Sequence, residues 1–266
     1  MICLTGDVHQ PIGSMDQRVA RLNEPACALR WAEIAASHGL KATLFVAGRA
    51  VIEHPVETRT LAGLGHVAIG GHTYSCFLPR PLFRVLRLVS GAAYGPAWYQ
   101  RWDAARTVRL IEGLTGEPCL TWRTHAFRSD ARTYEAVRRA GVRVISDEVT
   151  GPEVTHPRRL GVISLPLNTL DDHTHLYHGL RTPEHVRRKR AAGTGGVGIG
   201  PDPESYSPAE WVDRVLRQVE EIASSGGIAT ILAHPICMHV AGDFRSFERL
   251  CRALRGHESI WAHEVR

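Results

Sequence analysis

The sequence predicts an α/β fold built on a mostly parallel sheet, because short apolar strands alternate with helical patterns along the whole chain. About seven runs have the length and the β-branched or apolar content of buried strands; they are residues 2–5, 42–46, 67–69, 120–122, 142–145, 162–165 and 228–232. Helical patterns separate them, at residues 25–38, 53–64, 102–114, 131–140 and 207–224. Helical crossovers between parallel strands produce either an open doubly wound sheet or a barrel.

The clearest helix is expected to begin at Ser207. Ser207 is an N-cap residue, Pro208 occupies the first helical position and Glu210 completes a capping box. The Gly226–Gly227 pair then ends the helix.

One segment interrupts the alternation of strands and helices. Residues 168–208 contain a His/Asp cluster, the basic run 187–190 and a glycine-rich stretch that continues to residue 203. Residues 193–198 satisfy GxGxxG, but they follow a basic run rather than a strand, so they predict a flexible loop and not a dinucleotide site. The basic run predicts a solvated face, with attraction of an anionic group as the alternative. We therefore expect a single domain over residues 1–266 with a long loop insertion near 168–208.

The composition is that of a globular protein. Of 266 residues, 44% are hydrophobic and 22% are charged, which excludes intrinsic disorder. The net charge of +5 comes from arginines scattered along the chain, which is not the pattern of a nucleic-acid-binding surface. No apolar run approaches the roughly 20 residues that cross a bilayer. Neither nucleic acid nor a membrane is therefore an expected partner.

Two features favour a cytoplasmic location. The first residues lack a basic leader followed by a long apolar stretch. The six cysteines are far apart and lack any CxxC spacing, which argues against a disulfide framework and a structural zinc knuckle and favours buried free thiols.

Fifteen histidines make imidazole chemistry the first candidate activity. Five predicted strands end in chemically capable side chains, and the carboxyl ends of parallel strands meet at one edge of the fold. Each of these residues, taken alone, also fits a capping or structural role. Their expected convergence in one crevice favours a shared catalytic role over those separate roles. The residues are Asp7 and His9, His72, Arg123 and His125, Asp147, and His234.

The order and spacing of these motifs resemble the polysaccharide deacetylase superfamily, the NodB-homology domain of carbohydrate esterases. Asp7-Val8-His9 resembles the family's first acidic motif, and 71–76 resembles its His-Ser/Thr motif, with Cys76 where a second histidine is often found. Arg123-Thr124-His125-Ala126, Asp147 and Leu232-Ala233-His234 resemble the third, fourth and fifth motifs. The resemblance implies a distorted (β/α) barrel of about seven parallel strands.

The resemblance also implies roles for individual residues. A divalent ion, with zinc as the expected metal, is bound by His9 and His72 together with Asp7, and Cys76 is a further candidate ligand. Asp7 is the base, Arg123 orients it, His234 is the acid, and Asp147 holds the other ring nitrogen of His234. His125, Asp172, His173, His175 and Tyr74 are expected to line the substrate crevice. For the Asp/His-rich run 171–178 a second metal site is the alternative.

The activity implied is removal of an N-acetyl group from an amino sugar, a glycoside or a related intracellular small molecule. Two alternatives remain open from the sequence. One is hydrolysis of another carbon–nitrogen bond, in a cyclic ureide or imide; the other is a carbohydrate-binding pseudoenzyme.

Overall fold

The centre of the protein is one sheet in this computed structural model, which describes residues 1–152, 154, 156–192 and 204–266. Its strand order is β6-β7-β5-β4-β3-β2-β1-β8, so β6 and β8 are the two edges. Every pairing is parallel except that of β6 with β7. The strands are β1 (Ile2–Val8), β2 (Ala42–Val46), β3 (Val67–Gly71), β4 (Thr121–Trp122), β5 (Val144–Ile145), β6 (Arg158–Arg159), β7 (Val162–Ser164) and β8 (Ala229–Leu232).

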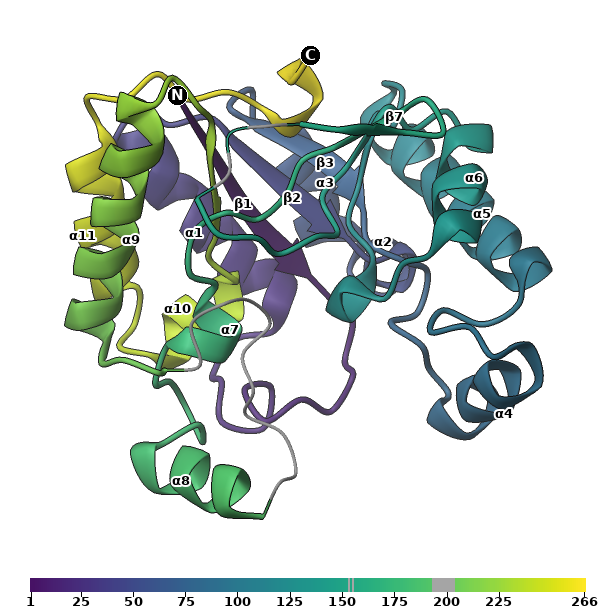
Figure 1. Ribbon diagram of the computed structural model, residues 1–266, viewed down its shortest axis with the longest axis horizontal. Helices are drawn as coiled ribbons and strands as arrows, with labels where there is room; N and C mark the ends of the chain where they lie inside the picture. The colour runs from purple at the N-terminus through teal and green to yellow at the C-terminus, as the bar shows by residue number, and fades with distance from the viewer. Residues whose placement is uncertain (153, 155, 193–203) are drawn as a thin grey trace.

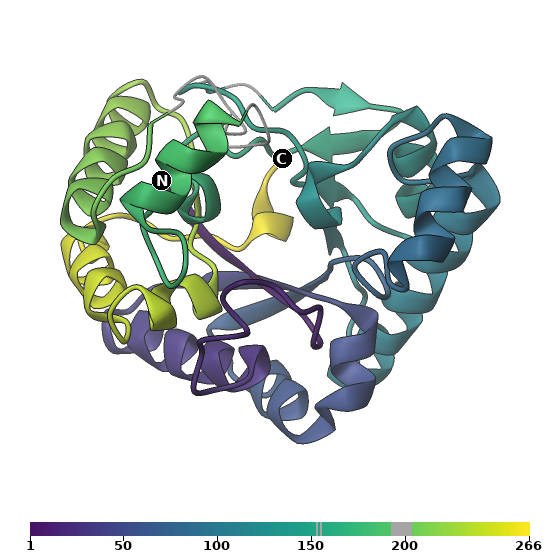
Figure 2. The same ribbon diagram turned by 90° about the horizontal axis from the view of Figure 1, so that it is seen from below.

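Helices surround the curled sheet, as the view from below shows (Figure 2). In the N-terminal half they are α1 (Glu24–Ser37), α2 (Gly48–Glu53), α3 (Pro55–Ala62), α4 (Arg80–Ser90) and α5 (Ala97–Thr115). In the C-terminal half they are α6 (Ala131–Arg139), α7 (Asp172–His175), α8 (Pro183–Ala191), α9 (Pro208–Ser224), α10 (Pro235–Val240) and α11 (Arg245–Leu254). Two 3₁₀ turns, η1 (His125–Phe127) and η2 (Ala262–Glu264), complete the described elements (Figure 1).

The predicted fold class is confirmed. All seven predicted strands are present and form a distorted, mostly parallel half-barrel, to which the short antiparallel β6 is an addition. The capping box predicted for α9 is also present, because Ser207 and Glu210 bond to each other's backbone and Pro208 opens the helix.

The described residues within 168–208 contain more regular structure than the predicted loop. They include α7 and α8, and Leu176 pairs with Tyr206 in an isolated bridge. The basic run 187–190 lies on α8, where these residues are exposed, as expected for a solvated face. The GxGxxG stretch at 193–198 lies outside the described residues.

The interior of the half-barrel is apolar at the end where the parallel strands begin, which lies beside the two chain termini in Figure 1. Cys3 and Phe45 pack there with Leu165, and the C-terminal segment closes this end with Ile260 and Val265. Ile260 donates a backbone hydrogen bond to Ile2, and Ala262 donates one to the Thr43 hydroxyl. Apolar filling at this end leaves the opposite end, where the parallel strands terminate, as the place for polar chemistry.

All six cysteines are buried free thiols, as the sequence predicted. No helix of the described residues is long and apolar enough to cross a membrane.

Candidate active site

The site begins with the alternation of side chains along β1. Cys3 belongs to the interior cluster, whereas Ile2, Leu4 and Val8 pack outside the sheet against the helices. Because side chains alternate along an extended strand, Asp7 points to the same side as Cys3. The two-residue spacing then brings His9 to the same end of the half-barrel as Asp7.

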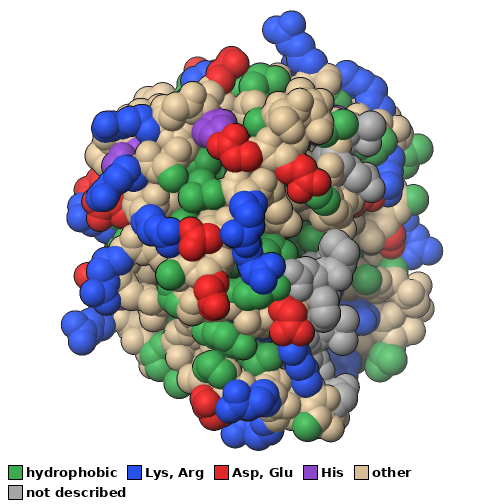
Figure 3. Space-filling view, turned by 60° about the vertical axis from the view of Figure 1, so that its left-hand side comes forward, with side chains coloured by type: hydrophobic (Ala, Val, Ile, Leu, Met, Phe, Trp, Pro, Cys, Tyr) green, Lys and Arg blue, Asp and Glu red, His purple; other side chains and the backbone are tan. Residues whose placement is uncertain are grey.

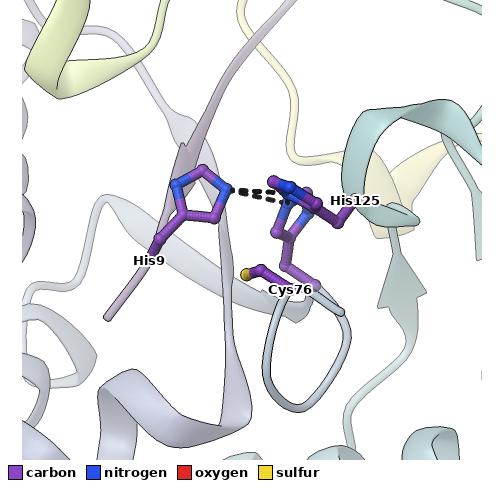
Figure 4. Close-up of side chains that lie close together, drawn as sticks. His9, Cys76 and His125 are labelled. Carbon is purple, nitrogen blue, oxygen red and sulfur yellow. Dashed lines mark hydrogen bonds between the residues drawn. The ribbon is translucent and has the colours of Figure 1, made fainter. Parts of the chain in front are cut away.

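Three imidazole nitrogens converge on one point beside Asp7. His9 Nε2 lies 3.1 Å from His72 Nε2, and both lie 3.2 Å from His125 Nδ1. Figure 4 shows His9 and His125 facing each other, with Cys76 close by. Donor atoms of all four residues lie within 4.8 Å of one another.

This cluster fits a divalent metal ion. Zn–N bonds of about 2.1 Å at tetrahedral angles separate ligand nitrogens by about 3.4 Å, close to the separations of these three rings. Burial lowers the pKa of His72 to about 3 and that of His125 well below its usual value, with the neighbouring imidazoles adding to the effect. Neutral imidazole is the form that binds a metal.

The carboxylate of Glu24 determines which ring nitrogen of His9 is free to bind a metal. His9 Nδ1 lies 2.7 Å from Glu24 Oε2, and the His9 backbone N–H donates to the same oxygen. Gln17 donates to the other carboxylate oxygen, Oε1. With its proton held at Nδ1, His9 presents the Nε2 lone pair to the cluster, as ligand histidines commonly do.

The donor set differs from the expected one. His125, which we expected to contact substrate, belongs to the cluster, whereas Asp7 does not. Both Asp7 oxygens have other neighbours: Oδ1 accepts from Arg123, and Oδ2 lies 3.5 Å from His234 Nε2 and 3.8 Å from His72 Nδ1. Cys76 is a candidate donor as its thiolate, but burial raises the pKa of this thiol well above its usual value.

Arg123 is fully buried and holds Asp7 in place. Its guanidinium donates to the Asp7 carboxylate at 2.9 Å, to the Thr5 hydroxyl, and to Ser146. Burial alone would raise the pKa of Asp7, but Arg123, His72 and His234 outweigh it and hold that pKa well below its usual range. Asp7 is therefore an ionised carboxylate at neutral pH.

His234 is the candidate acid, and Asp172 holds its ring in place. Asp172 Oδ1 lies 2.7 Å from His234 Nδ1, and Asp172 Oδ2 accepts the backbone N–H of His234. Burial lowers the pKa of His234, but Asp172 and Asp7 together raise it well above its usual value. His234 can therefore carry a proton on Nε2, facing Asp7.

The residue that holds His234 was predicted incorrectly. We expected Asp147 in this role, but Asp147 accepts from the Tyr134 hydroxyl at 3.0 Å. Burial also raises the pKa of Asp147, in keeping with its remote position. At the end of β5 it is Ser146, and not Asp147, that contacts the site, because its hydroxyl accepts a hydrogen bond from Arg123.

Of the residues predicted to line the substrate crevice, His173 borders the cavity that lies between Asp7, His9 and His234, whereas Tyr74 and His175 do not. Tyr74 packs edge-on against Trp102, because the positive φ of Thr73 interrupts the extended alternation that would have kept it beside His72. His175 is buried, with Nδ1 2.8 Å from the Glu204 carbonyl. Asp172 acts on His234 and not on the cavity.

These groups border one cavity of about 340 Å³. Asp7 and His234 meet the cluster histidines His9 and His125 along its wall. Apolar surface is contributed by Ile12, Phe127 and Ile236. The arrangement places a candidate base, a candidate acid and a candidate metal centre around a space of small-molecule size.

One comparison with known protein families gave a match. The polysaccharide deacetylase family model matches residues 28–145, which include His72, Arg123 and His125 but not Asp7, His9 or His234. A search of curated proteins gave no match.

Solved structures share the fold over nearly the whole chain. A putative polysaccharide deacetylase from Mycobacterium smegmatis aligns with a TM-score of 0.69 at 15% identity, covering 98% of this chain and 85% of that one. Puue allantoinase aligns with a TM-score of 0.60 at 14% identity, covering 98% and 87%. BA3943, a CE4 family pseudoenzyme from Bacillus anthracis, aligns with a TM-score of 0.55 at 16% identity, and the match spans 97% of this chain but only 62% of that one. The family match over residues 28–145 and the shared fold both agree with the resemblance of this chain to the polysaccharide deacetylase superfamily.

Proposed function

We propose that the protein is a metal-dependent hydrolase that removes an N-acetyl group from an amino sugar, a glycoside or a related intracellular small molecule. The observation that carries the proposal is the convergence of His9, His72 and His125 beside the Asp7–His234 pair. All of these residues except His72 border one cavity. The family match supports a deacetylase-type hydrolase, and zinc is the ion we propose for three imidazole donors.

In this mechanism a bound divalent ion supplies Lewis acidity, which acidifies water and polarises the amide carbonyl. Asp7, held ionised by Arg123, accepts the proton of the attacking water. His234 donates the proton on its own Nε2 to the leaving nitrogen. Asp172 keeps the His234 ring oriented and favours its charged form.

The size of the cavity supports a small substrate. About 340 Å³ is at the lower end of the volumes typical of small-molecule sites. Free, buried cysteines are typical of a reducing compartment and support the intracellular part of the proposal. On the face drawn in Figure 3, Lys and Arg side chains are interspersed with Asp and Glu, which supports a substrate other than nucleic acid.

The experiment is a screen of acetate release across N-acetylated sugars, glycosides and sugar nucleotides, run beside cyclic ureides and imides. Zinc-loaded wild type is expected to release acetate from at least one N-acetylated compound, and Asp7→Asn should abolish this release while retaining metal. Ring opening of a ureide without any acetate release would identify the alternative hydrolase. Binding of sugars without turnover of any compound would identify a pseudoenzyme.

A further inference from the structure

A second group of metal-ligating side chains lies in the same cavity wall, apart from the first. It consists of Asp16, His173, His178 and Cys237, whose donor atoms lie within 4.8 Å of one another. It shares no residue with the cluster of His9, His72, Cys76 and His125. We propose that these four residues form a second divalent-metal site, of structural type, that fixes one wall of the cavity.

The four donors come from three segments that are distant in the sequence. Asp16 belongs to the turn after β1, His173 and His178 lie in and just after α7, and Cys237 lies in α10. Asp16, His173 and Cys237 border the same cavity as His9 and His234. An ion here would tie three pieces of the cavity wall together.

His178 is oriented as a ligand. Its Nδ1 lies 2.8 Å from the Leu176 carbonyl, which can only accept, so this nitrogen carries a proton. The other nitrogen, Nε2, is then the one placed to bind a metal, and it lies 3.5 Å from Asp16 Oδ1. The 3.5 Å between these two atoms exceeds the roughly 2.7–2.9 Å of a charge-assisted hydrogen bond and is close to the separation of two ligands of one zinc ion.

The carboxylate of Asp16 also fits a bound cation. Its side chain is only 4% exposed, and Oδ1 has no hydrogen-bond partner within the part of the chain that the structure describes. The Cys237 thiol points at the other oxygen, Oδ2, from 4.0 Å. A buried carboxylate oxygen without a donor is costly unless a cation neutralises it.

The donor chemistry identifies the class of ion. Two imidazoles, one carboxylate and one thiolate suit zinc, whereas magnesium and calcium prefer oxygen ligands. Four protein donors complete a tetrahedron and leave no open position, which is typical of structural and not catalytic zinc. Closing the donors from within 4.8 Å to tetrahedral separations of about 3.5 Å requires shifts of about 1 Å.

Zinc content of the purified protein tests the proposal directly. After dialysis, wild type is expected to hold two zinc ions per chain, His178→Gln one, and His72→Gln one, because each variant removes a ligand of a different site. One ion in wild type that His178→Gln leaves in place would overturn the second site. One ion that His178→Gln removes and His72→Gln retains would support the second site while contradicting the proposed catalytic one.

Cobalt substitution identifies the thiolate with matched controls. A cysteine ligand gives a thiolate-to-cobalt charge-transfer band, and each site contains one candidate cysteine. The Cys76→Ser variant is expected to keep the band that arises from Cys237, and the Cys76→Ser, Cys237→Ser double variant to lose it. Absence of the band in the Cys76→Ser variant would overturn the proposal. Because this variant changes only one buried side chain, and conservatively, it is expected to fold.

Discussion

At the scale of single residues, the candidate centre depends on the acidic side chains that hydrogen-bond to its histidines as much as on the histidines themselves. Glu24 fixes the proton of His9, and Asp172 raises the pKa of His234. Neither residue would be found by looking for strand-end histidines alone. Glu24 gives no signal beyond being an acidic residue at a helix start, where a role in stabilising the helix dipole is the ordinary explanation.

Replacing Glu24 tests its part in metal binding. Glu24→Gln should weaken zinc affinity about 10–100-fold, because the hydrogen bond that orients His9 and increases its basicity is reduced. Competition with a chelator of known affinity measures the change. Glu33→Gln, at an exposed position of the same helix α1, is the matched control and should leave affinity unchanged. Equal affinities of the two variants would contradict the assigned role.

The protonation of His234 should make turnover depend on pH. The proposed acid works only while protonated, so turnover is expected to fall as pH rises through the raised pKa of His234. Asp172 is a main cause of that raised pKa, so Asp172→Asn should move the alkaline limb of kcat/KM to lower pH. Identical alkaline limbs in the two proteins would show that Asp172 does not set the acid's pKa.

At the scale of elements, the sequence was informative where a pattern has one local cause. The strands and the start of α9 were predicted because apolar runs and a capping box each favour one conformation. The position of His125 in the metal cluster was not predictable in this way. Ala126 and Phe127 have φ values of 54° and 53° in the turn that carries His125, and no residue there signals a left-handed backbone.

The same limitation explains Tyr74. Alternation in an extended segment would keep it beside His72, but Thr73 has a φ of 66° and turns the chain. Non-glycine residues adopt this conformation only where the surrounding structure enforces it, and such positions concentrate at functional sites. The loop geometry that builds the site therefore comes from tertiary contacts, which a local pattern does not contain.

The cap of α9 gives a prediction at the same scale. Ser207→Ala removes the side-chain acceptor for the Glu210 backbone N–H and should lower the free energy of unfolding by about 1 kcal/mol. Ser224→Ala, at the other end of the helix, removes only a hydroxyl that donates to the Glu221 carbonyl and should cost less. Chemical denaturation compares the two variants, and an equal loss would contradict the capping role.

At the scale of the whole molecule, stability should depend on a buried acid that the proposed mechanism does not use. Asp103 in α5 accepts from the Tyr94 hydroxyl and from the Tyr74 backbone, while its second oxygen has no hydrogen-bond partner in the described structure. Burial outweighs these hydrogen bonds and raises the pKa of Asp103 to about 7. The folded protein therefore holds a proton that the unfolded chain releases near pH 3.8.

The sign of the effect follows from proton linkage. Between about pH 3.8 and about pH 7 the folded state binds more protons, so this group makes stability fall by up to about 1.4 kcal/mol per pH unit as pH rises. Asp103→Asn keeps the shape and removes the titration. The variant should gain stability relative to wild type as pH increases from 5 to 8, measured by chemical denaturation. A constant difference between the two proteins over that range would contradict the raised pKa.

The architecture of the whole chain was more predictable than its chemistry. Order along the chain was enough to place Asp7, His9, His72, Arg123 and His234 at one end of the half-barrel, because parallel strands end together. The metal donors and the partner of His234 depend on distances between loops. Asp147 follows β5 and Asp172 begins α7, and only the folded chain shows which of the two acids contacts His234.

The central claim is that His9, His72 and His125 hold the catalytic ion. Anomalous diffraction from crystals of the zinc-loaded protein, recorded at the zinc edge, tests it most directly. We predict a peak about 2.1 Å from His9 Nε2, His72 Nε2 and His125 Nδ1, with Asp7 outside bonding distance. A zinc-loaded crystal without a peak between these three rings, or with the ion bound by Asp7 in place of His125, would contradict the account.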